Sequence, residues 1–303
     1  MSEAGPSPPP VRAAPRPPAV AGRGTEAAEL FGPVVRAALD EDLGAGGDPT
    51  SAGLAGEAAA RLVARAGGMV AGLAGVEVVL AETATRLGLP PAGFAAAASD
   101  GDRVAAGTPL GRLTGPARVL LAAERTLLNL VGHLSGVATL TAAYVAGVEG
   151  TGTVVRDTRK TTPGLRLLEK YAVRCGGGRN HRLGLYDALL VKDNHIRAAG
   201  GLAAAARAAR AAAPGLPLEV EAETLDEVAE ALEAGCDLVL LDNMDAANMA
   251  RAVVMASGRA QTEASGGITL ATVRAVAETG VDYVAVGALT HSAPALDVAL
   301  DWE

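Results

Sequence analysis

The chain has 303 residues, half of them apolar and only 2% aromatic, and its formal net charge is −8. A chain of this length is expected to form two domains. Its acidic balance argues against a nucleic-acid or membrane partner, and no run approaches 18 apolar residues, so no transmembrane helix is expected. Two cysteines, Cys175 and Cys236, make no disulfide framework; both are expected to be small buried hydrophobes in a reducing cytoplasm.

Residues 1–24 contain seven prolines and no apolar run like that of a signal peptide, which predicts a disordered tail. Residues 25–150 show a mixed pattern. In chain order we expect a helix at 27–43, short strands within 58–70, a helix at 76–87, a strand at 93–99, hairpin-like segments at 99–113, and one long or two shorter helices at 118–148. The hairpin-like part resembles a biotinyl or lipoyl carrier, but a carrier needs a lysine and none precedes Lys160.

From residue 151 to 290 the rhythm is regular and predicts parallel strands joined by crossover helices. The six expected strands are TVVRD, ALLVKD, PLEVEAE, CDLVLLD, QTEASGG and VDYVAVG, with helices at 202–213, 225–233, 246–257 and 270–278. An open doubly wound sheet and a barrel share this alternation. Reactive side chains follow every successive strand and not one switch point, which favours a TIM-like α/β barrel of about six strands with its site at the C-terminal face.

Lysine is rare in this chain, which uses arginine for 23 of its 26 cations. The three lysines, Lys160, Lys170 and Lys192, lie within one window with a net charge of +6 (residues 156–197), which indicates a small polyanionic ligand. A lysine kept in such a chain suggests a position where the arginine fork cannot substitute. Lys160 and Lys192 follow strands and are candidate phosphate ligands. Lys170 lies inside a predicted helix and is expected to be an ordinary solvated charge.

Further candidates follow the same strand ends. The cationic set adds Arg159, His181 and Arg182, which suit carboxylates and phosphates. Glu221 and Asp242 end the third and fourth strands, where they would hold Mg²⁺ or ribose hydroxyls, or alternatively cap the next helix.

A glycine-rich cradle is expected in the last third of the chain. Ser265, Gly266 and Gly267 are predicted to open a helix and, with Gly287 and Ala288 after the last strand, to bind phosphate through backbone N–H groups. Among the histidines, His133 is expected to pack in a helix and His195 to support a loop.

From about residue 30 to the end, the chain resembles quinolinate phosphoribosyltransferases. The likeness is carried by ERTLLNLVGHLSGVAT, by DTRKTTPGLRLLEKYAVRCGGGRNHRLGLYDALLVKDNHI, and by the shorter stretches LEVEAE, LVLLDNM, EASGGI and VAVGALTHSAPALD. The resemblance implies an incomplete α/β barrel with an N-terminal α/β open-sandwich domain, here residues 25–150. It also implies a C-terminal segment (291–303) that returns to that domain, and a homodimer.

The resemblance further implies the reaction and its residues. Quinolinate and phosphoribosyl pyrophosphate would give nicotinate mononucleotide, diphosphate and CO₂, with Mg²⁺ as cofactor. The residues implied to bind the two quinolinate carboxylates are Arg159, His181, Arg182 and Arg125 of the neighbouring subunit, with Thr158 beside them. Lys160 and Lys192 would face the diphosphate, Glu221 and Asp242 the ribose and metal, and Ser265–Gly267, Gly287 and Ala288 the 5′-phosphate.

Two alternatives remain at this point. One is a related phosphoribosyltransferase acting on nicotinate, although one carboxylate would not need so many cations. The other is a barrel that binds a phosphorylated metabolite without catalysis, although such a protein would not need carboxylates opposite a diphosphate.

Overall fold

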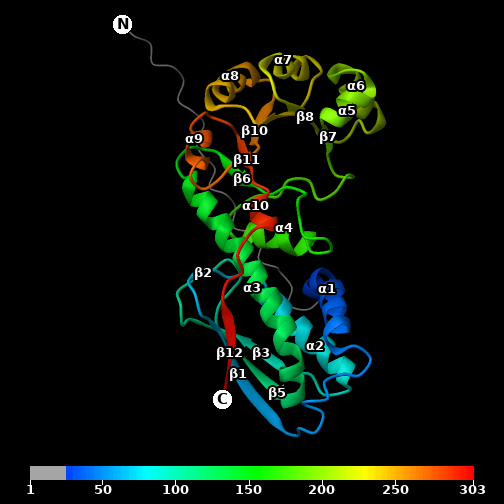
Figure 1. Ribbon diagram of the computed structural model, residues 1–303, viewed down its shortest axis with the longest axis vertical. Coiled ribbons are helices and arrows are strands. Elements are labelled where there is room, and N and C mark those ends of the chain that lie inside the picture. Colours follow the sequence, from blue (N-terminus) through cyan, green and yellow to red (C-terminus); the bar gives the residue numbers. More distant parts are fainter. Residues whose placement is uncertain (1–24) are drawn as a thin grey trace.

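The computed structural model describes residues 25–303, and the predicted tail lies outside that range. Two sheet-containing domains are joined by one long helix (Figure 1). The first domain contains an antiparallel sheet, and the second contains the parallel sheet that was predicted.

The N-terminal domain pairs an antiparallel sheet with two helices. Its strands are ordered β12-β1-β5-β3, and β12 (Val298–Trp302) comes from the end of the chain to pair with β1 (Glu57–Ala64). The other two strands are β3 (Gly93–Ala96) and β5 (Pro109–Pro116). The remaining elements are α1 (Thr25–Leu43), α2 (Val76–Leu87), a short 3₁₀ helix (Leu73–Gly75), and the pair β2 (Gly68–Met69) and β4 (Arg103–Val104).

The long helix α3 (Ala117–Gly147) is one element and not two. It is long and apolar enough to cross a membrane by length and composition, but half of its most apolar window is buried inside the molecule. It packs on α1 and α2 of the first domain and on α4 (Arg166–Cys175) of the second. We therefore describe α3 as the core helix that connects the two domains.

The second domain is built on six parallel strands in the order β6-β11-β10-β9-β8-β7. Their bounds are β6 Val154–Arg156, β7 Leu189–Val191, β8 Leu218–Ala222, β9 Leu238–Asp242, β10 Gln261–Ser265 and β11 Tyr283–Ala285. The first two strands in sequence are the two edges of the sheet, the order expected for an incomplete barrel. All six strand predictions are confirmed in type and place.

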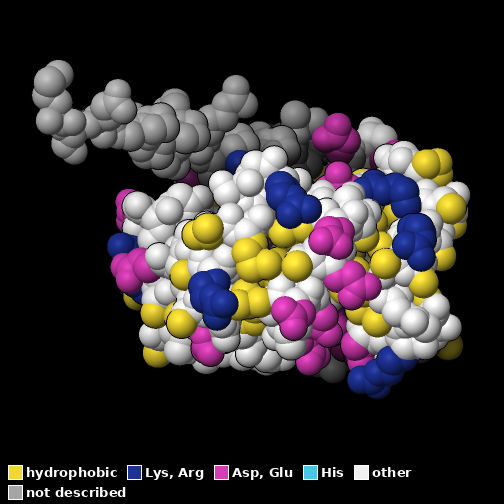
Figure 2. Space-filling view, turned by 90° about the horizontal axis from the view of Figure 1, so that it is seen from above, with side chains coloured by type: hydrophobic (Ala, Val, Ile, Leu, Met, Phe, Trp, Pro, Cys, Tyr) yellow, Lys and Arg dark blue, Asp and Glu magenta, His cyan; other side chains and the backbone are white. Residues whose placement is uncertain are grey.

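Helices follow the strands along the chain. Besides α4 they are α5 (Asp193–Ala199), α6 (Leu202–Ala212), α7 (Leu225–Glu233), α8 (Ala246–Ala256), α9 (Val273–Ala277) and α10 (Ala288–His291). Thr224 and Glu227 form a capping box at α7, and Asp245 caps α8. On the face seen from the α7–α8 end, side chains of both charges are interspersed (Figure 2).

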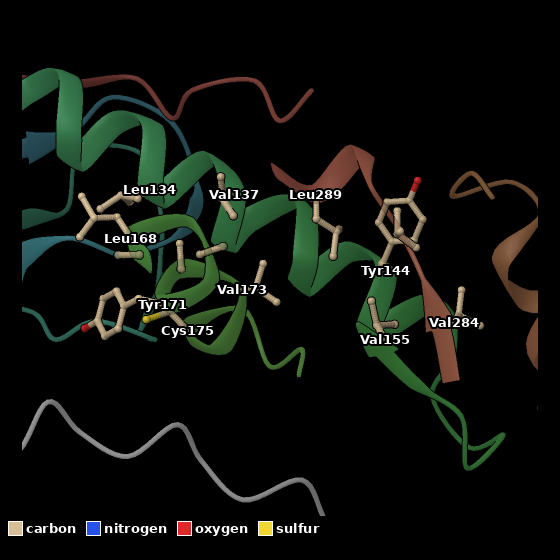
Figure 3. Close-up of a cluster of buried hydrophobic side chains, with 14 of the residues drawn as sticks. Leu134, Val137, Tyr144, Val155, Leu168, Tyr171, Val173, Cys175, Val284 and Leu289 are labelled. Carbon is tan, nitrogen blue, oxygen red and sulfur yellow. The ribbon is translucent and has the colours of Figure 1, made fainter. Parts of the chain in front are cut away.

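The core is continuous between the domains. Leu134 and Val137 of α3 lie beside Leu168, Tyr171 and other side chains of α4, and further along α3 Tyr144 lies by the β6 and β11 strands (Figure 3). Cys175 and Cys236 are both buried and unpaired, as predicted. This packing fixes α4, the helix that carries Lys170, against α3.

Candidate active site

The carboxyl ends of the parallel strands meet at one edge of the sheet, as their shared direction requires. Lys192 follows β7 and Glu221 lies near the end of β8, and the two strands pair in parallel. The Lys192 ammonium lies 2.9 Å from a Glu221 carboxylate oxygen, with the Lys192 side chain still 44% exposed. His195 supports this corner by accepting the backbone N–H of Lys192, as expected. The predicted cation and carboxylate are therefore neighbours.

Asp242 ends β9 and lies in register with Ser265 of β10. One of its oxygens accepts the side-chain amide of Asn243 at 2.7 Å. Asn243 is in the left-handed region (φ 54°), and a Cβ on Gly266 would approach its side-chain oxygen to 2.1 Å. Gly266 (φ 97°) is thus required by both backbone conformation and close contact.

The glycine cradle differs from its prediction in one respect. Gly267 also has a positive φ (58°), with open space around its Cβ position. The helix begins only at Val273, because Thr269 and Thr272 first form a turn in which the Thr272 hydroxyl accepts the Thr269 N–H. The prediction that these residues open a helix is wrong. The backbone N–H groups that could bind phosphate here belong to a loop.

Lys160 lies between β6 and the last β/α turn. Its backbone carbonyl accepts the Thr290 hydroxyl at 2.8 Å, and its N–H binds the Thr158 hydroxyl at 3.0 Å. A Cβ on Gly287 would lie 3.1 Å from the Lys160 side chain and 3.1 Å from His291. The aliphatic stem of Lys160 therefore runs beside Gly287, while the residue as a whole is exposed.

Two neighbouring guanidinium groups, those of Arg159 and Arg182, can still donate hydrogen bonds to an acceptor. We call this pair the arginine clamp. In the described part of the chain, the Nε atoms of Arg159 and Arg182 are buried and make no hydrogen bond. Burial lowers the pKa of Arg182, and the neighbouring charge of Arg159 lowers it further. An anion placed between them would supply the missing acceptors and offset the repulsion.

His181 is buried beside this pair, and its ring nitrogens are both engaged within the protein. Nδ1 accepts the backbone N–H of Arg182 at 2.6 Å, which assigns the ring proton to Nε2. Nε2 lies 2.9 Å from Glu219 and 3.4 Å from Glu263. The histidine is thus placed next to the clamp, but by contacts that sequence reasoning did not anticipate.

The buried network below the clamp was missed. Arg156, Glu219 and Glu263 come from β6, β8 and β10, alternate strands in sequence, and Arg156 binds Glu263 at 2.6 Å. The available signal was a charged side chain within each of these three strands, because a buried charge needs a partner. His181, Glu219 and Glu263 also have donor types that suit a metal, but Arg156 already pairs with Glu263.

Glu263 has a pKa raised to about 7, first by burial and then by the nearby charge of Glu219, although Arg156 and His181 oppose the rise. The folded protein therefore holds this proton more tightly than the unfolded chain. Between about pH 4.5 and 7 the free energy of unfolding should fall as pH rises, by on the order of 3 kcal/mol for this group.

Glu263→Gln imitates the protonated acid and should remove this dependence. We expect the wild-type unfolding free energy, minus that of Glu263→Gln, to decrease between pH 5 and 8 in denaturant titrations. Glu278→Gln, in an exposed pair with Arg274, serves as the matched control with a constant difference. Parallel pH curves for wild type and Glu263→Gln would contradict the expectation.

Lys170 is not the solvated charge that its helical position suggested. It is fully buried and pairs with Asp157, which is also fully buried. Burial lowers the pKa of Lys170 and raises that of Asp157, and the ion pair opposes both shifts. The prediction failed because α4 packs with this face against the end of β6, which local sequence cannot reveal. His133, predicted to pack in a helix, lies half-buried on α3 and contacts Glu169 of α4 at 2.9 Å.

Arg125 stands apart from the other candidates. It is exposed on α3, and among the described residues no hydrogen bond or ion pair joins it to the rest of the site. Ala288 begins α10 directly after Gly287. The single chain therefore brings together the strand-end residues, the arginine pair and the glycine loops, but not Arg125.

The sequence matches two family profiles that together span most of the chain. They are described as the N-terminal domain of quinolinate phosphoribosyl transferase, over residues 50–135, and its C-terminal domain, over residues 137–301. A protein of Mycobacterium leprae named nicotinate-nucleotide pyrophosphorylase (carboxylating) is 48% identical over 279 residues, 88% of this chain and 95% of that protein. A protein of Nicotiana glauca named quinolinate phosphoribosyltransferase (decarboxylating) 1 is 39% identical, over 88% and 81%.

Solved structures agree with these matches. The nicotinate-nucleotide pyrophosphorylase of Francisella tularensis superposes with a TM-score of 0.86 at 38% identity, covering 91% of this chain and 96% of that one. Human nicotinic acid phosphoribosyltransferase has a TM-score of 0.56 at 16% identity, over 82% and 70%. The second likeness is one of fold alone.

Proposed function

This chain belongs to the quinolinate phosphoribosyl transferase family, and we propose that it converts quinolinate and phosphoribosyl pyrophosphate into nicotinate mononucleotide, diphosphate and CO₂ in NAD biosynthesis. The observation that carries the proposal is the pair of neighbouring guanidiniums, Arg159 and Arg182, whose buried Nε atoms make no hydrogen bond within the described chain. Two neighbouring cations suit a dicarboxylate better than a monocarboxylate.

Quinolinate is assigned to this arginine clamp. The carboxylates would accept hydrogen bonds from Arg159 and Arg182, with Thr158 nearby. His181 stays in the proposal as a neighbour of the clamp, since its ring already binds Glu219 and the Arg182 N–H. We propose that Arg125 completes the clamp from the neighbouring subunit of a homodimer. Its exposed position on α3 is compatible with that role.

Phosphoribosyl pyrophosphate is assigned to the strand ends and glycine loops. Lys160 and Lys192 would bind the diphosphate, and the 5′-phosphate would accept N–H groups of Ser265–Gly267, Gly287 and Ala288. As the bond from ribose C1 to diphosphate breaks, its electron pair leaves with the diphosphate, and the two ammonium groups stabilise that charge. Glu221 and Asp242 would balance the positive charge on the ribose ring.

The ring chemistry needs no further group. The pyridine nitrogen forms the new bond to C1 and becomes a pyridinium. The bond to the carboxylate on the adjacent ring carbon then breaks, CO₂ leaves, and the electron pair stays on that carbon, where it takes up a proton from water to form a C–H bond. The buried Arg182 and the half-buried Arg159 would partly withdraw the departing carboxylate from water, which would favour this step.

Mg²⁺ fits the acidic pair. Glu221 uses one oxygen for Lys192 and Asp242 one for Asn243, so among the described residues each keeps an oxygen for a cation. Mg²⁺ commonly binds one or two carboxylates together with substrate phosphates. It would supply further charge stabilisation for the diphosphate.

The reaction is tested by its products. The purified protein, with quinolinate, phosphoribosyl pyrophosphate and Mg²⁺, should release CO₂ and nicotinate mononucleotide in equal amounts, and a chelator should suppress both. Turnover of nicotinate but not quinolinate would refute the assignment in favour of a related transferase. Binding of phosphoribosyl pyrophosphate without its consumption would indicate a sensor instead.

A cytoplasmic location is proposed from the cysteine usage.

A further inference from the structure

We propose that Lys170 is a positioning residue for quinolinate binding. With Asp157 it forms a buried lock that holds the segment bearing Arg182 against the segment bearing Arg159. Lys170 does not touch the substrate in this proposal, which rests on the assignment of quinolinate to the arginine clamp.

The lock grips both backbone groups of His181. The Lys170 ammonium donates to the His181 carbonyl at 3.0 Å and pairs with Asp157. The same Asp157 oxygen accepts the His181 N–H at 2.9 Å. The two peptide groups around His181 are thus held by the two members of one ion pair. Rotation of either peptide would break a buried hydrogen bond to a charged group, although the ion pair itself would remain.

Asn180 extends the lock on one side. Its side-chain amide donates to the second Asp157 oxygen and, at 2.8 Å, to the Lys170 carbonyl. Its side-chain oxygen accepts Arg174 of α4 at 2.8 Å. The segment with Asn180 and His181, which directly follows α4 in the chain, is therefore fastened back to that helix by side chains and backbone alike.

The lock lies next to both halves of the clamp in sequence. Asp157 is two residues before Arg159, and His181 is directly before Arg182. Joining Asp157 to His181 therefore limits how far the backbone before Arg159 can move from the backbone at Arg182. Backbone hydrogen bonds already join the two segments further back, because the Asp157 N–H binds the Arg179 carbonyl at 3.2 Å and the Arg179 N–H binds the Val155 carbonyl at 2.9 Å. The lock adds contacts nearer the two arginines.

The choice of residue agrees with this role. A buried ion pair adds little net stability, because desolvation offsets its attraction. Lysine nevertheless occurs here in a chain that elsewhere prefers arginine. A single ammonium at the end of a straight stem reaches Asp157 and the His181 carbonyl together, whereas a planar fork needs more room. α4 itself is anchored to the N-terminal domain. The hydroxyl of Tyr171, next to Lys170, donates to Asp100 of that domain at 2.7 Å (Figure 3 shows Tyr171 in the α3–α4 core).

The test separates positioning from stability. Lys170→Met keeps the stem and removes the ammonium. We expect its dissociation constant for quinolinate to rise about tenfold to a hundredfold, by analogy with the cost of a misplaced clamp. KM for phosphoribosyl pyrophosphate should change less than threefold. Leu80→Ala, a buried change in α2 of the other domain, is the control: it should lower stability without changing quinolinate affinity.

Two further variants keep the test decisive. The double variant Lys170→Met/Asp157→Asn leaves no unpaired buried charge, so it should fold even where the single variant does not, and should still bind quinolinate weakly. Lys170→Arg keeps the charge but should not restore affinity. Wild-type-like quinolinate binding by Lys170→Met, or by the double variant if the single one does not fold, would overturn the proposal. Absence of wild-type turnover would instead refute the proposed reaction.

Discussion

Replacing Lys160 with alanine is expected to lower kcat by about 10²–10³-fold, by analogy with the loss of one preorganised donor. The diphosphate is assigned to Lys160 and Lys192, so the charge of Lys160 is needed most as that group leaves; its stem runs beside Gly287, which is assigned to the 5′-phosphate. Steady-state kinetics with saturating quinolinate and phosphoribosyl pyrophosphate measure the effect.

The control for Lys160 is Arg197→Ala, which removes a cation from an exposed pair with Asp193 on α5. That variant should keep kcat within about twofold, since exposed ion pairs contribute little. A Lys160→Ala enzyme with near-normal kcat would show that the diphosphate does not depend on this ammonium.

Arg182→Met should weaken quinolinate binding by about 10²-fold or more. The guanidinium is buried and contributes charge-assisted hydrogen bonds, each of which is worth roughly 1.5–3 kcal/mol. The loss of affinity should be larger for quinolinate than for nicotinate, because only quinolinate has a second carboxylate whose contact with an arginine can be removed. Direct binding titrations with both acids give the comparison.

For Arg182 the matched change is Arg207→Met, at an exposed position of α6. It should leave both affinities unchanged. Equal losses for quinolinate and nicotinate in Arg182→Met would mean that the arginine binds the shared carboxylate or acts only on the fold. The selectivity argument drawn from the two guanidiniums would then be wrong.

Much of the architecture was predictable from the sequence. The helix at 76–87 matches α2 at both ends, and the six apolar runs became the six parallel strands. These elements depend on local periodicity and flanking turns, both of which are visible in the amino-acid sequence. The strand-end placement of Lys192 and Glu221 followed as well, because parallel strands bring their carboxyl ends to one edge.

The buried charges were not predictable in the same way. The sequence predicts a solvated charge at Lys170, and it gives no prediction for Glu263. Glu263 meets Arg156 across 107 positions of sequence. Whether such a charge is solvated or buried depends on which strands become neighbours, and a short window carries no record of that.

The sequence by itself determined the order and type of the elements, the cationic window and the kinds of side chain at the strand ends. Only the tertiary structure decided how those charges are paired: Lys192 with Glu221, Arg156 with Glu263, and Lys170 with Asp157. The physical reason is that periodicity and turn chemistry act over a few residues, whereas the partner of a charge is set by strand order and by helix packing.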